Sequence, residues 1–185
     1  MPLPIKNFFI ETLEVFLIAL FIVLPVRYFL IQPFVVKGQS MEPTFYNSDY
    51  LIIDELSYHL RSPKRGEVIV FRAPVAKNTY YIKRIIGLPN ETVEIKDGEI
   101  LVFDPKIKKE VNIKEDYIAS SVQTSGNVKI TLKPDEYFVL GDNRRLSYDS
   151  RNWGPVTRSE VVGRVLLRLY PLNQLQAFAA PEYSM

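Results

Sequence analysis

The 185-residue chain contains no cysteine and a single histidine. Without cysteine it has no disulfide, no thiolate nucleophile and no cysteine-ligated zinc site. One histidine supplies too few nitrogen ligands for a transition metal, so we expect neither a metal nor any other cofactor. The histidine itself, His59, lies in a turn-like stretch over residues 56–63 and is expected at the surface rather than as a general base.

The chain also lacks a surplus of either charge. Its 23 lysines and arginines are nearly matched by 21 aspartates and glutamates, which leaves a formal net charge of +2. Binding to nucleic acid needs a clustered basic surplus, so nucleic acid is not an expected partner. Hydrophobic residues make up 47% and aromatics 12%, which is typical of an ordered protein. The length accommodates one membrane segment and one globular domain of roughly 145 residues.

One apolar stretch approaches the length needed to cross a bilayer. Residues 15–26 carry no charge, and apolar residues resume after Arg27. A helix over residues 13–31 would be about 19 residues long, with Glu14 and Arg27 near its ends, where charged side chains reach the interface. A removed signal sequence and a buried core helix are the alternatives, but no small-residue cleavage site follows the stretch. We therefore predict a retained membrane anchor within residues 1–32.

From residue 33 to residue 185 the chain reads as a mainly β, antiparallel domain. Short β-type runs alternate with turn residues, and no long helical period occurs. Asp97-Gly98 predicts a tight hairpin, because both positions tolerate a positive φ. Residues 104–128 are rich in charge and serine and are predicted to be an inserted lobe or loop with a solvated face. The predicted strands are 34–36, 50–53, 67–71, 80–86, 92–95, 99–102, 129–132, 137–140 and 161–169.

Ser40 lies in residues 38–44 (GQSMEPT), a short distance after the apolar stretch. A serine hydroxyl is a poor nucleophile until a base removes its proton. With His59 discounted, the candidate bases are a carboxylate or a neutral lysine. A free lysine has a pKa near 10.4, so such a lysine must be buried away from water and anions.

Lys83 is the candidate lysine. Strand alternation places it on the same face as Tyr81 and Ile85, two large neighbours that would exclude water from an ammonium. The alternative is an edge lysine that reaches solvent past them. Arg84 has the same apolar flanking on the other face, so this pattern alone does not decide between the two. The polar loop over residues 141–155 also leaves two interpretations, a functional loop or one held together by Asp–Arg pairs and asparagine turns.

Four stretches together resemble the sequence boxes of type I signal peptidases in order, spacing and content. They are residues 38–44, 65–71, 81–89 and 141–151. The resemblance implies a single transmembrane helix followed by an antiparallel β-sheet catalytic domain of the signal peptidase/LexA-like type. It also implies a Ser–Lys peptidase in which Ser40 attacks the scissile carbonyl, while a neutral Lys83 takes its proton and later returns one to the leaving amine.

The same resemblance assigns supporting roles. Ser147 matches the family serine that hydrogen-bonds the lysine amine and orients it. The residues that match those holding the site loop are Asp142, Asp149 and Arg151, with an ion pair expected between the last two. The backbone N–H of Ser40 would meet the oxyanion. Some members carry a serine that donates a second hydrogen bond to the oxyanion. This chain has Gly38 at that position, which resembles the Gram-positive and cyanobacterial forms. Water, another group or a different backbone path would then replace the serine donor.

Substrate recognition also follows from the resemblance. The substrates would be signal peptides, bound as an added strand, with small residues one and three positions before the cut (Ala-x-Ala). Large apolar side chains align with the pocket walls, and the alternative is that they are core residues. They are Phe34, Val36, Met41, Phe45, Tyr81 and Ile82.

The implied protein is a membrane-bound serine endopeptidase, expected as a monomer in contact with the lipid bilayer. The resemblance places its N-terminus in the cytoplasm and its catalytic domain outside the cell membrane, or at the thylakoid membrane in a cyanobacterium. One alternative is a self-cleaving regulator of the same clan, which would bring an N-terminal DNA-binding domain for which residues 1–37 give no room. The other is a non-catalytic anchored binding module with the same fold.

Overall fold

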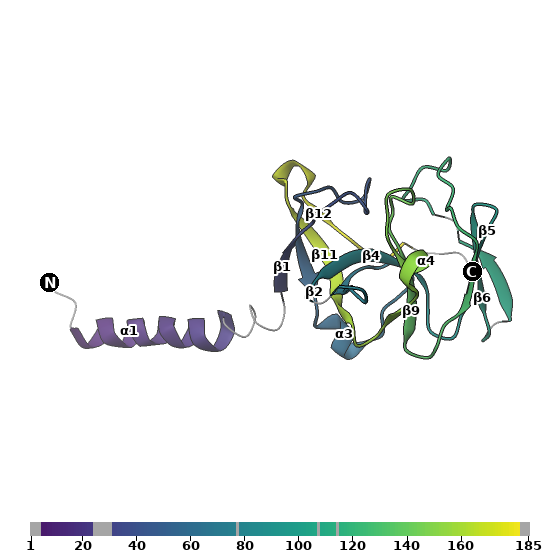
Figure 1. The fold of residues 1–185 in the computed structure, drawn as a ribbon. Helices are drawn as coiled ribbons and strands as arrows, with labels where there is room; N and C mark the ends of the chain where they lie inside the picture. The colour runs from purple at the N-terminus through teal and green to yellow at the C-terminus, as the bar shows by residue number, and fades with distance from the viewer. Residues whose placement is uncertain (1–4, 24–30, 77, 107, 114, 182–185) are drawn as a thin grey trace.

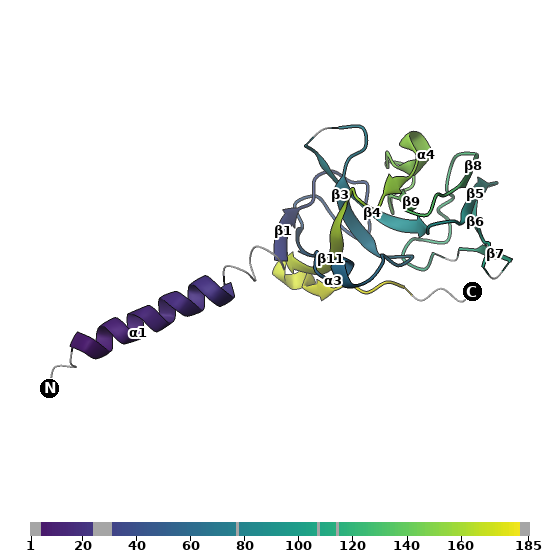
Figure 2. The same ribbon diagram turned by 90° about the horizontal axis from the view of Figure 1, so that it is seen from below.

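The computed structural model describes residues 5–23, 31–76, 78–106, 108–113 and 115–181. An N-terminal helix, α1 (Ile5–Ile18), continues into a π-helical turn, η1 (Ala19–Val23), and extends away from a β-rich domain (Figures 1 and 2). Apolar side chains of this helix are exposed; Phe8, for example, is 64% exposed. The buried core of the described residues therefore lies in the β-rich domain.

The predicted membrane helix over residues 13–31 matches the structure only in part. Its first half lies in α1 and η1, and residues 24–30 lie outside the described residues. Ile31 pairs with Asp54 in an antiparallel ladder, so its inclusion in the helix was wrong. Within the described part of the chain, no helix combines the length and the apolar character needed to cross a bilayer.

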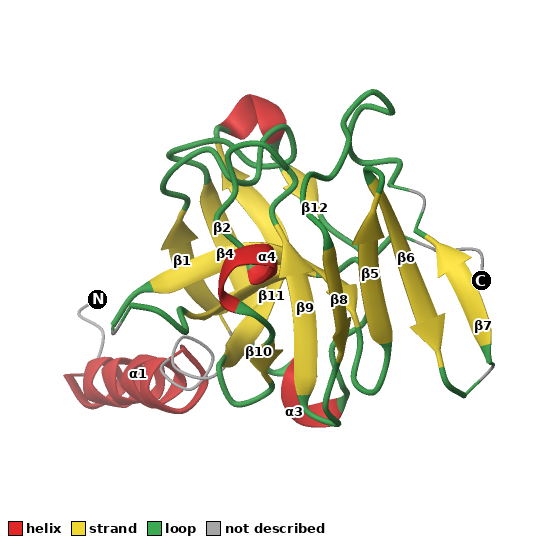
Figure 3. Cartoon of the chain, turned by 45° about the vertical axis from the view of Figure 1, so that its right-hand side comes forward, coloured by secondary structure: helices red, strands yellow, loops and turns green. Residues whose placement is uncertain are grey.

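Two antiparallel sheets form the β-rich domain (Figure 3), which confirms the prediction of a mainly antiparallel β fold. In the described residues the larger sheet has the strand order β1-β2-β11-β3-β4-β9-β10, with β12 paired to β11, and the smaller sheet has the order β7-β6-β5-β8. The larger sheet contains β1 (Ile31–Val35), β2 (Tyr50–Asp54), β3 (Val68–Arg72), β4 (Tyr80–Gly87), β9 (Glu136–Leu140), β10 (Val156–Thr157), β11 (Val161–Tyr170) and β12 (Gln176–Ala177). The smaller sheet contains β5 (Thr92–Lys96), β6 (Glu99–Asp104), β7 (Lys109–Asn112) and β8 (Val128–Thr131). Short helical turns complete the domain: α3 (Ser57–Leu60), α4 (Ser150–Trp153) and η2 (Leu172–Gln174).

Turn chemistry explains the hairpin between β5 and β6. Asp97 and Gly98 both have a positive φ, 53° and 87°, and Lys96 pairs with Glu99 across them, so the predicted hairpin is confirmed. The strands that the sequence did not predict, β7, β10 and β12, have four residues or fewer and no alternating apolar pattern of their own. Their pairing with longer neighbours places them in the sheets.

Alternation along β4 distributes its side chains among different parts of the core. Tyr81 and Ile85 pack with Phe71 on one face of the larger sheet. Ile82 packs against the cluster on the other face, and Ile86 joins the core between β9 and the smaller sheet. The predicted facing of β4 is therefore confirmed, and it places the side chain at position 83 among buried apolar neighbours.

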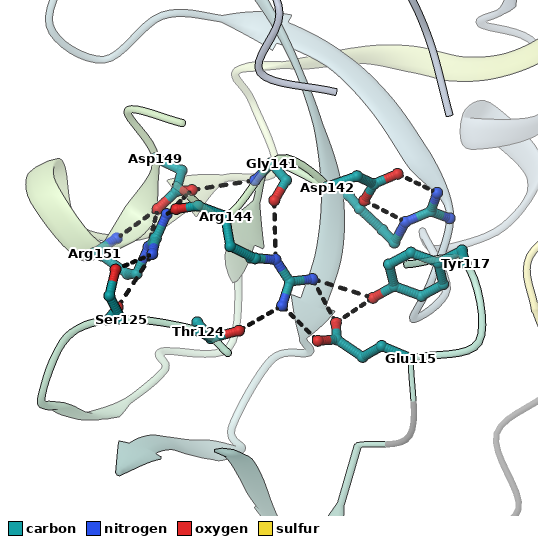
Figure 4. Close-up of polar contacts among 10 residues, drawn as sticks. Glu115, Tyr117, Thr124, Ser125, Gly141, Asp142, Arg144, Asp149 and Arg151 are labelled. Atoms are coloured by element: carbon teal, nitrogen blue, oxygen red, sulfur yellow. Dashed lines mark hydrogen bonds and ion pairs between the residues drawn. The ribbon is translucent and has the colours of Figure 1, made fainter. Parts of the chain in front are cut away.

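The segment over residues 104–128 differs from a solvated lobe. Residues 109–112 form β7 at the edge of the smaller sheet, where Glu110 is exposed as predicted. Glu115 and Thr124, in contrast, turn toward the loop after β9 and bind Arg144 (Figure 4). The prediction of an exposed charged face is therefore wrong for Glu115, because its carboxylate pairs with a buried guanidinium.

Candidate active site

Ser40 lies in a tight turn that follows β1. The backbone N–H of Glu42 donates to the carbonyl of Gln39, and that of Phe45 donates to the carbonyl of Met41. The side chains of Met41 and Phe45 are 1% and 0% exposed and anchor the turn in the core. These contacts therefore fix the position of the turn that carries the Ser40 hydroxyl.

Lys83 meets this hydroxyl from β4. Its Nζ lies 2.7 Å from Ser40 Oγ and donates to the carbonyl of Ile82 at 2.8 Å. Lys83 is 4% exposed, so the alternative of an edge lysine that reaches solvent is wrong. Burial lowers the pKa of Lys83 to about 8, against the opposing attraction of the Asp149 and Asp142 carboxylates. The neutral form, which a general base requires, is therefore a minor but accessible fraction near neutral pH and grows as the pH rises through about 8.

Asp142 connects three parts of the site. Arg84 binds its carboxylate at two points, with Nε 2.8 Å from Oδ1 and Nη2 2.6 Å from Oδ2. The hydroxyl of Thr44, in the turn after Ser40, donates to Asp142 Oδ2 at 2.5 Å. Asp142 therefore ties the loop after β9 to strand β4 and to the nucleophile turn.

Asp149 and Arg151 form the predicted ion pair, which is confirmed by an Nε–Oδ1 distance of 2.8 Å (Figure 4). Asp149 also accepts from the backbone N–H of Gly141 at 3.1 Å and caps the start of α4 together with Asn152. Arg151 donates in addition to the carbonyl of Arg144 at 2.8 Å. These bonds fold residues 141–151 back on themselves.

Ser147 lies beside the nucleophile without the predicted bond. Its Oγ is buried and has no hydrogen-bond partner among the described residues, so the bond to the Lys83 amine is not formed here. A Cβ added at Gly141 would lie 2.2 Å from Ser147 Oγ and 2.4 Å from the carbonyl oxygen of Ser40. Only glycine at position 141 therefore lets the loop close against Ser40, and the N–H of Asn143 then donates to that carbonyl at 3.1 Å.

A groove of about 600 Å³ leads to Ser40 and Lys83. Of the predicted pocket residues, Phe34, Val36, Tyr81 and Ile82 line the groove. Met41 and Phe45 do not line it, because both side chains point into the core beneath the turn, where the Phe45 ring lies 4.5 Å from that of Phe178. The prediction was therefore wrong for these two. Lining residues that the sequence did not indicate include Leu51, Val70, Tyr80, Leu146 and Tyr148.

The groove runs along unpaired strand edges. Residues 80–83 of β4 pair with β3 on one side, whereas β9 pairs with β4 only from Arg84 onward. In the described residues, β1 is the edge strand of the larger sheet and pairs with β2 alone. Free backbone groups on such edges can bind an extended peptide by adding it as a strand.

The backbone conformation at position 38 favours glycine over the serine that some family members carry there. Gly38 has a φ of +89°, a conformation that favours glycine, and its N–H donates to Asn47 Oδ1 at 3.0 Å. A side chain here would have space but a strained backbone. His59 is exposed in α3, with its Nδ1 bonded to the carbonyl of Glu55, as expected for a surface histidine.

Several residues that shape the site were missed by the sequence interpretation, namely Thr44, Arg84, Asn143, Arg144, Glu115 and Tyr117. Their partners lie tens of residues away along the chain. The one local signal was the density of charged and polar residues in the loop over residues 141–155.

A serine hydroxyl bonded to a buried amine, in the lining of a groove beside free strand edges, suits a peptidase that acts through serine. Residues 9–170 match the Peptidase_S26 family, described as "Signal peptidase, peptidase S26". The chain belongs to this family and is a serine peptidase.

Two relatives that are similar in sequence over most of the chain agree with this assignment. The chain is 36% identical over 175 residues to signal peptidase I P of Bacillus subtilis subsp. natto, covering 92% of this chain and 94% of that protein. It is 38% identical to the probable signal peptidase I-2 of Synechocystis sp., covering 93% and 78%. A crystal structure of a signal peptidase I from Enterococcus faecalis V583 aligns with a TM-score of 0.47 and 31% identity, over 56% of this chain and 97% of that one.

Proposed function

We propose that this peptidase removes N-terminal signal peptides from exported precursor proteins, with Ser40 as nucleophile and Lys83 as general base. The observation that carries the proposal is the 2.7 Å contact between Ser40 Oγ and the Nζ of a lysine that burial keeps partly neutral. The names of its relatives, signal peptidase I, support the choice of substrate.

The chemistry needs one base that works twice. As Ser40 Oγ bonds to the scissile carbonyl carbon, Lys83 Nζ accepts the hydroxyl proton. When the tetrahedral intermediate collapses, the C–N bond breaks and the Lys83 ammonium gives its proton to the leaving amine. Water then attacks the acyl ester while Lys83 again accepts a proton, and Ser40 is restored when that proton returns to Oγ.

Two further groups take part in this proposal. The backbone N–H of Ser40 donates to the oxyanion, where a preorganised donor contributes a few kcal/mol to transition-state stabilisation. Ser147 receives the Lys83 amine when it moves or is protonated, because its buried Oγ has an unused hydrogen-bonding capacity beside Ser40. Asp142, Asp149 and Arg151 hold the loop that carries Ser147.

Groove shape supports a preference for small residues before the cut, of the Ala-x-Ala type. The floor and walls near Ser40 include Val36, Leu51, Val70 and Ile82, and the ring of Phe34 stands 5.6 Å from that of Tyr80. A precursor segment added as a strand would direct alternate side chains toward this apolar floor.

The proposal places the enzyme at a membrane through a single anchor within residues 1–32, with a cytoplasmic N-terminus and an extracytoplasmic catalytic domain acting as a monomer. In a cyanobacterium the thylakoid membrane is the second possible site. Support comes from the apolar side chains that α1 exposes, among them Phe8, Leu13 and Phe16, since a row of exposed apolar side chains is costly in water.

The test is cleavage of a precursor. Full-length protein in detergent is incubated with a precursor that carries one Ala-x-Ala site, and the new N-terminus is sequenced. We expect one cut after the second alanine, and none with Ser40→Ala. A cut elsewhere, or equal cutting by Ser40→Ala, contradicts the proposal.

A further inference from the structure

Arg144, in the loop after β9, is a charged residue that is almost completely buried. Its side chain is the largest of those almost completely buried, with the residue 1% exposed. The Nε donates to the carbonyl of Gly141 at 2.9 Å, and Nη1 donates to Thr124 Oγ1 at 2.7 Å. The compensating charge comes from Glu115, whose carboxylate binds both terminal nitrogens (Figure 4). A buried guanidinium needs such a partner, because leaving it unpaired is strongly destabilising.

The segment that contains Glu115 and Thr124 also contacts a second arginine of the site, Arg84. The ring of Tyr117 covers the guanidinium of Arg84, with 3.8 Å between Cζ and the ring centroid. Its hydroxyl donates to Glu115 and lies 3.4 Å from Arg144 Nη2. Residues 115–125, here called the clamp segment, lie between β7 and β8 of the smaller sheet, so this sheet contacts the scaffold of the site through both arginines.

These two arginines set the surroundings of the Ser40–Lys83 pair. Arg84 holds Asp142, and Arg144 holds the carbonyl of Gly141, which packs against Ser40. Around the amine lie Ser40 Oγ, the Tyr81 ring at 5.7 Å and the carboxylates of Asp142 and Asp149. Both carboxylates are paired, with Arg84 and Arg151 respectively. A loosened arginine would let water in and leave a carboxylate free to attract the ammonium form.

We propose that Glu115 and Tyr117 are positioning residues for catalysis. They fix Arg144 and Arg84 and, through them, keep the Ser40–Lys83 pair in contact and dry. The smaller sheet is then part of the catalytic apparatus, although none of its side chains lines the groove. This inference rests on the proposed function of Ser40 and Lys83.

The test compares Glu115→Gln and Tyr117→Leu with Glu110→Gln, which removes the same charge from an exposed position on β7. Full-length proteins in detergent are assayed for kcat and KM on the Ala-x-Ala precursor across pH. We expect kcat to fall at least about ten-fold in both clamp variants, since small displacements of reacting groups are costly. KM should change little, because the groove is untouched, and the alkaline rise of kcat/KM should move to higher pH. Glu110→Gln should match the parent.

The proposal is overturned if both clamp variants keep the kcat and the pH midpoint of the parent, even when their thermal stability falls, because the segment is then structural only. Tyr117→Phe keeps the ring on Arg84 and loses only the hydroxyl bonds, so it should fold and show a smaller shift of the same sign. If Glu115→Gln does not fold, the Tyr117 pair decides the question. Failure of the parent to cleave the precursor contradicts the proposed function instead.

Discussion

The two faces of strand β4 carry two neighbouring buried basic side chains with different hydrogen-bond partners. Lys83 and Arg84 are 4% and 5% exposed, so burial does not distinguish them. Arg84 has a two-point pair with Asp142, whereas Lys83 contacts a hydroxyl and a carbonyl, and its pKa falls to about 8. Burial therefore lowers the pKa of a lysine that has no carboxylate bonded to it, whereas the buried arginine is paired with a carboxylate.

Residue type reinforces this division. Arginine stays charged in proteins and therefore needs its carboxylate, while lysine can respond to burial by losing its proton. Alternation along β4 allows both in succession, since it sends Lys83 to Ser40 and Arg84 to Asp142 on opposite faces. One strand thus supplies a base and a scaffold residue.

The largest effect is expected when arginine occupies both position 83 and position 84. Lys83→Arg places a permanently charged group beside Ser40 that cannot accept its proton. We expect precursor cleavage to fall by on the order of 10⁴-fold or more, as for Ser40→Ala. Initial rates on the Ala-x-Ala precursor measure the loss, with circular dichroism as the control for folding. Substantial turnover by a folded Lys83→Arg variant argues against lysine as the base.

Removing the cation on the other face should affect stability. Arg84→Met leaves the Asp142 carboxylate buried and unpaired, so we expect a loss of about 3–5 kcal/mol in the free energy of unfolding. Denaturant titration in detergent checks the value. The double variant Arg84→Met/Asp142→Asn should recover part of the loss, and no recovery would show that the pair is not its source.

Replacing the base by an apolar side chain should instead stabilise the fold at low pH. The shift of the Lys83 pKa from 10.5 to about 8 corresponds to about 3 kcal/mol. Because the folded value is the lower one, the unfolded chain binds more protons between these values, and the stability of the parent rises with pH across that window. Lys83→Met should therefore exceed the parent by about 3 kcal/mol at about pH 6, and the gap should shrink toward pH 10. A gap independent of pH would indicate a simple packing effect.

The smallest effect is expected from a change in the backbone that leads to Ser40, the residue whose hydroxyl contacts Lys83. Gly38→Ala places a side chain at a φ of +89°, and we expect a loss of about 1–2 kcal/mol in stability with a lower kcat, because the backbone leading to Ser40 shifts. Gly154 has the same φ at the end of α4 and serves as the matched control. Gly154→Ala should cost similar stability and leave kcat closer to the parent. Equal kcat losses in both would remove the special role of position 38.

Sequence predicted what local periodicity and turn chemistry determine. The alternation of β4 placed Lys83 and Arg84 on opposite faces, and Asp97-Gly98 predicted the hairpin of the smaller sheet. The family resemblance identified the serine and the lysine, which lie 43 positions apart and meet in the structure. The same resemblance implied the Asp149–Arg151 ion pair, which the structure contains.

Long-range packing accounts for what the sequence did not predict. Glu115 and Arg144 are 29 positions apart, and nothing in a charged segment distinguishes a glutamate that turns inward from its exposed neighbours. Met41 and Phe45 were assigned to the pocket because the resemblance aligns them with pocket-wall positions, but the turn directs them to the core. The free hydroxyl of Ser147 depends on how closely Gly141 approaches Ser40, which no local pattern reports.

The most direct measurement is the titration of the Lys83 amine itself, by NMR of protein labelled at lysine side chains, with Lys83→Arg to assign its signal. We expect a pKa of about 8, so that the amine loses its proton as the pH rises through that value and cleavage rises with it. A Lys83 pKa at the ordinary lysine value of about 10.4, with cleavage already constant below it, would contradict the claim that a neutral lysine activates Ser40.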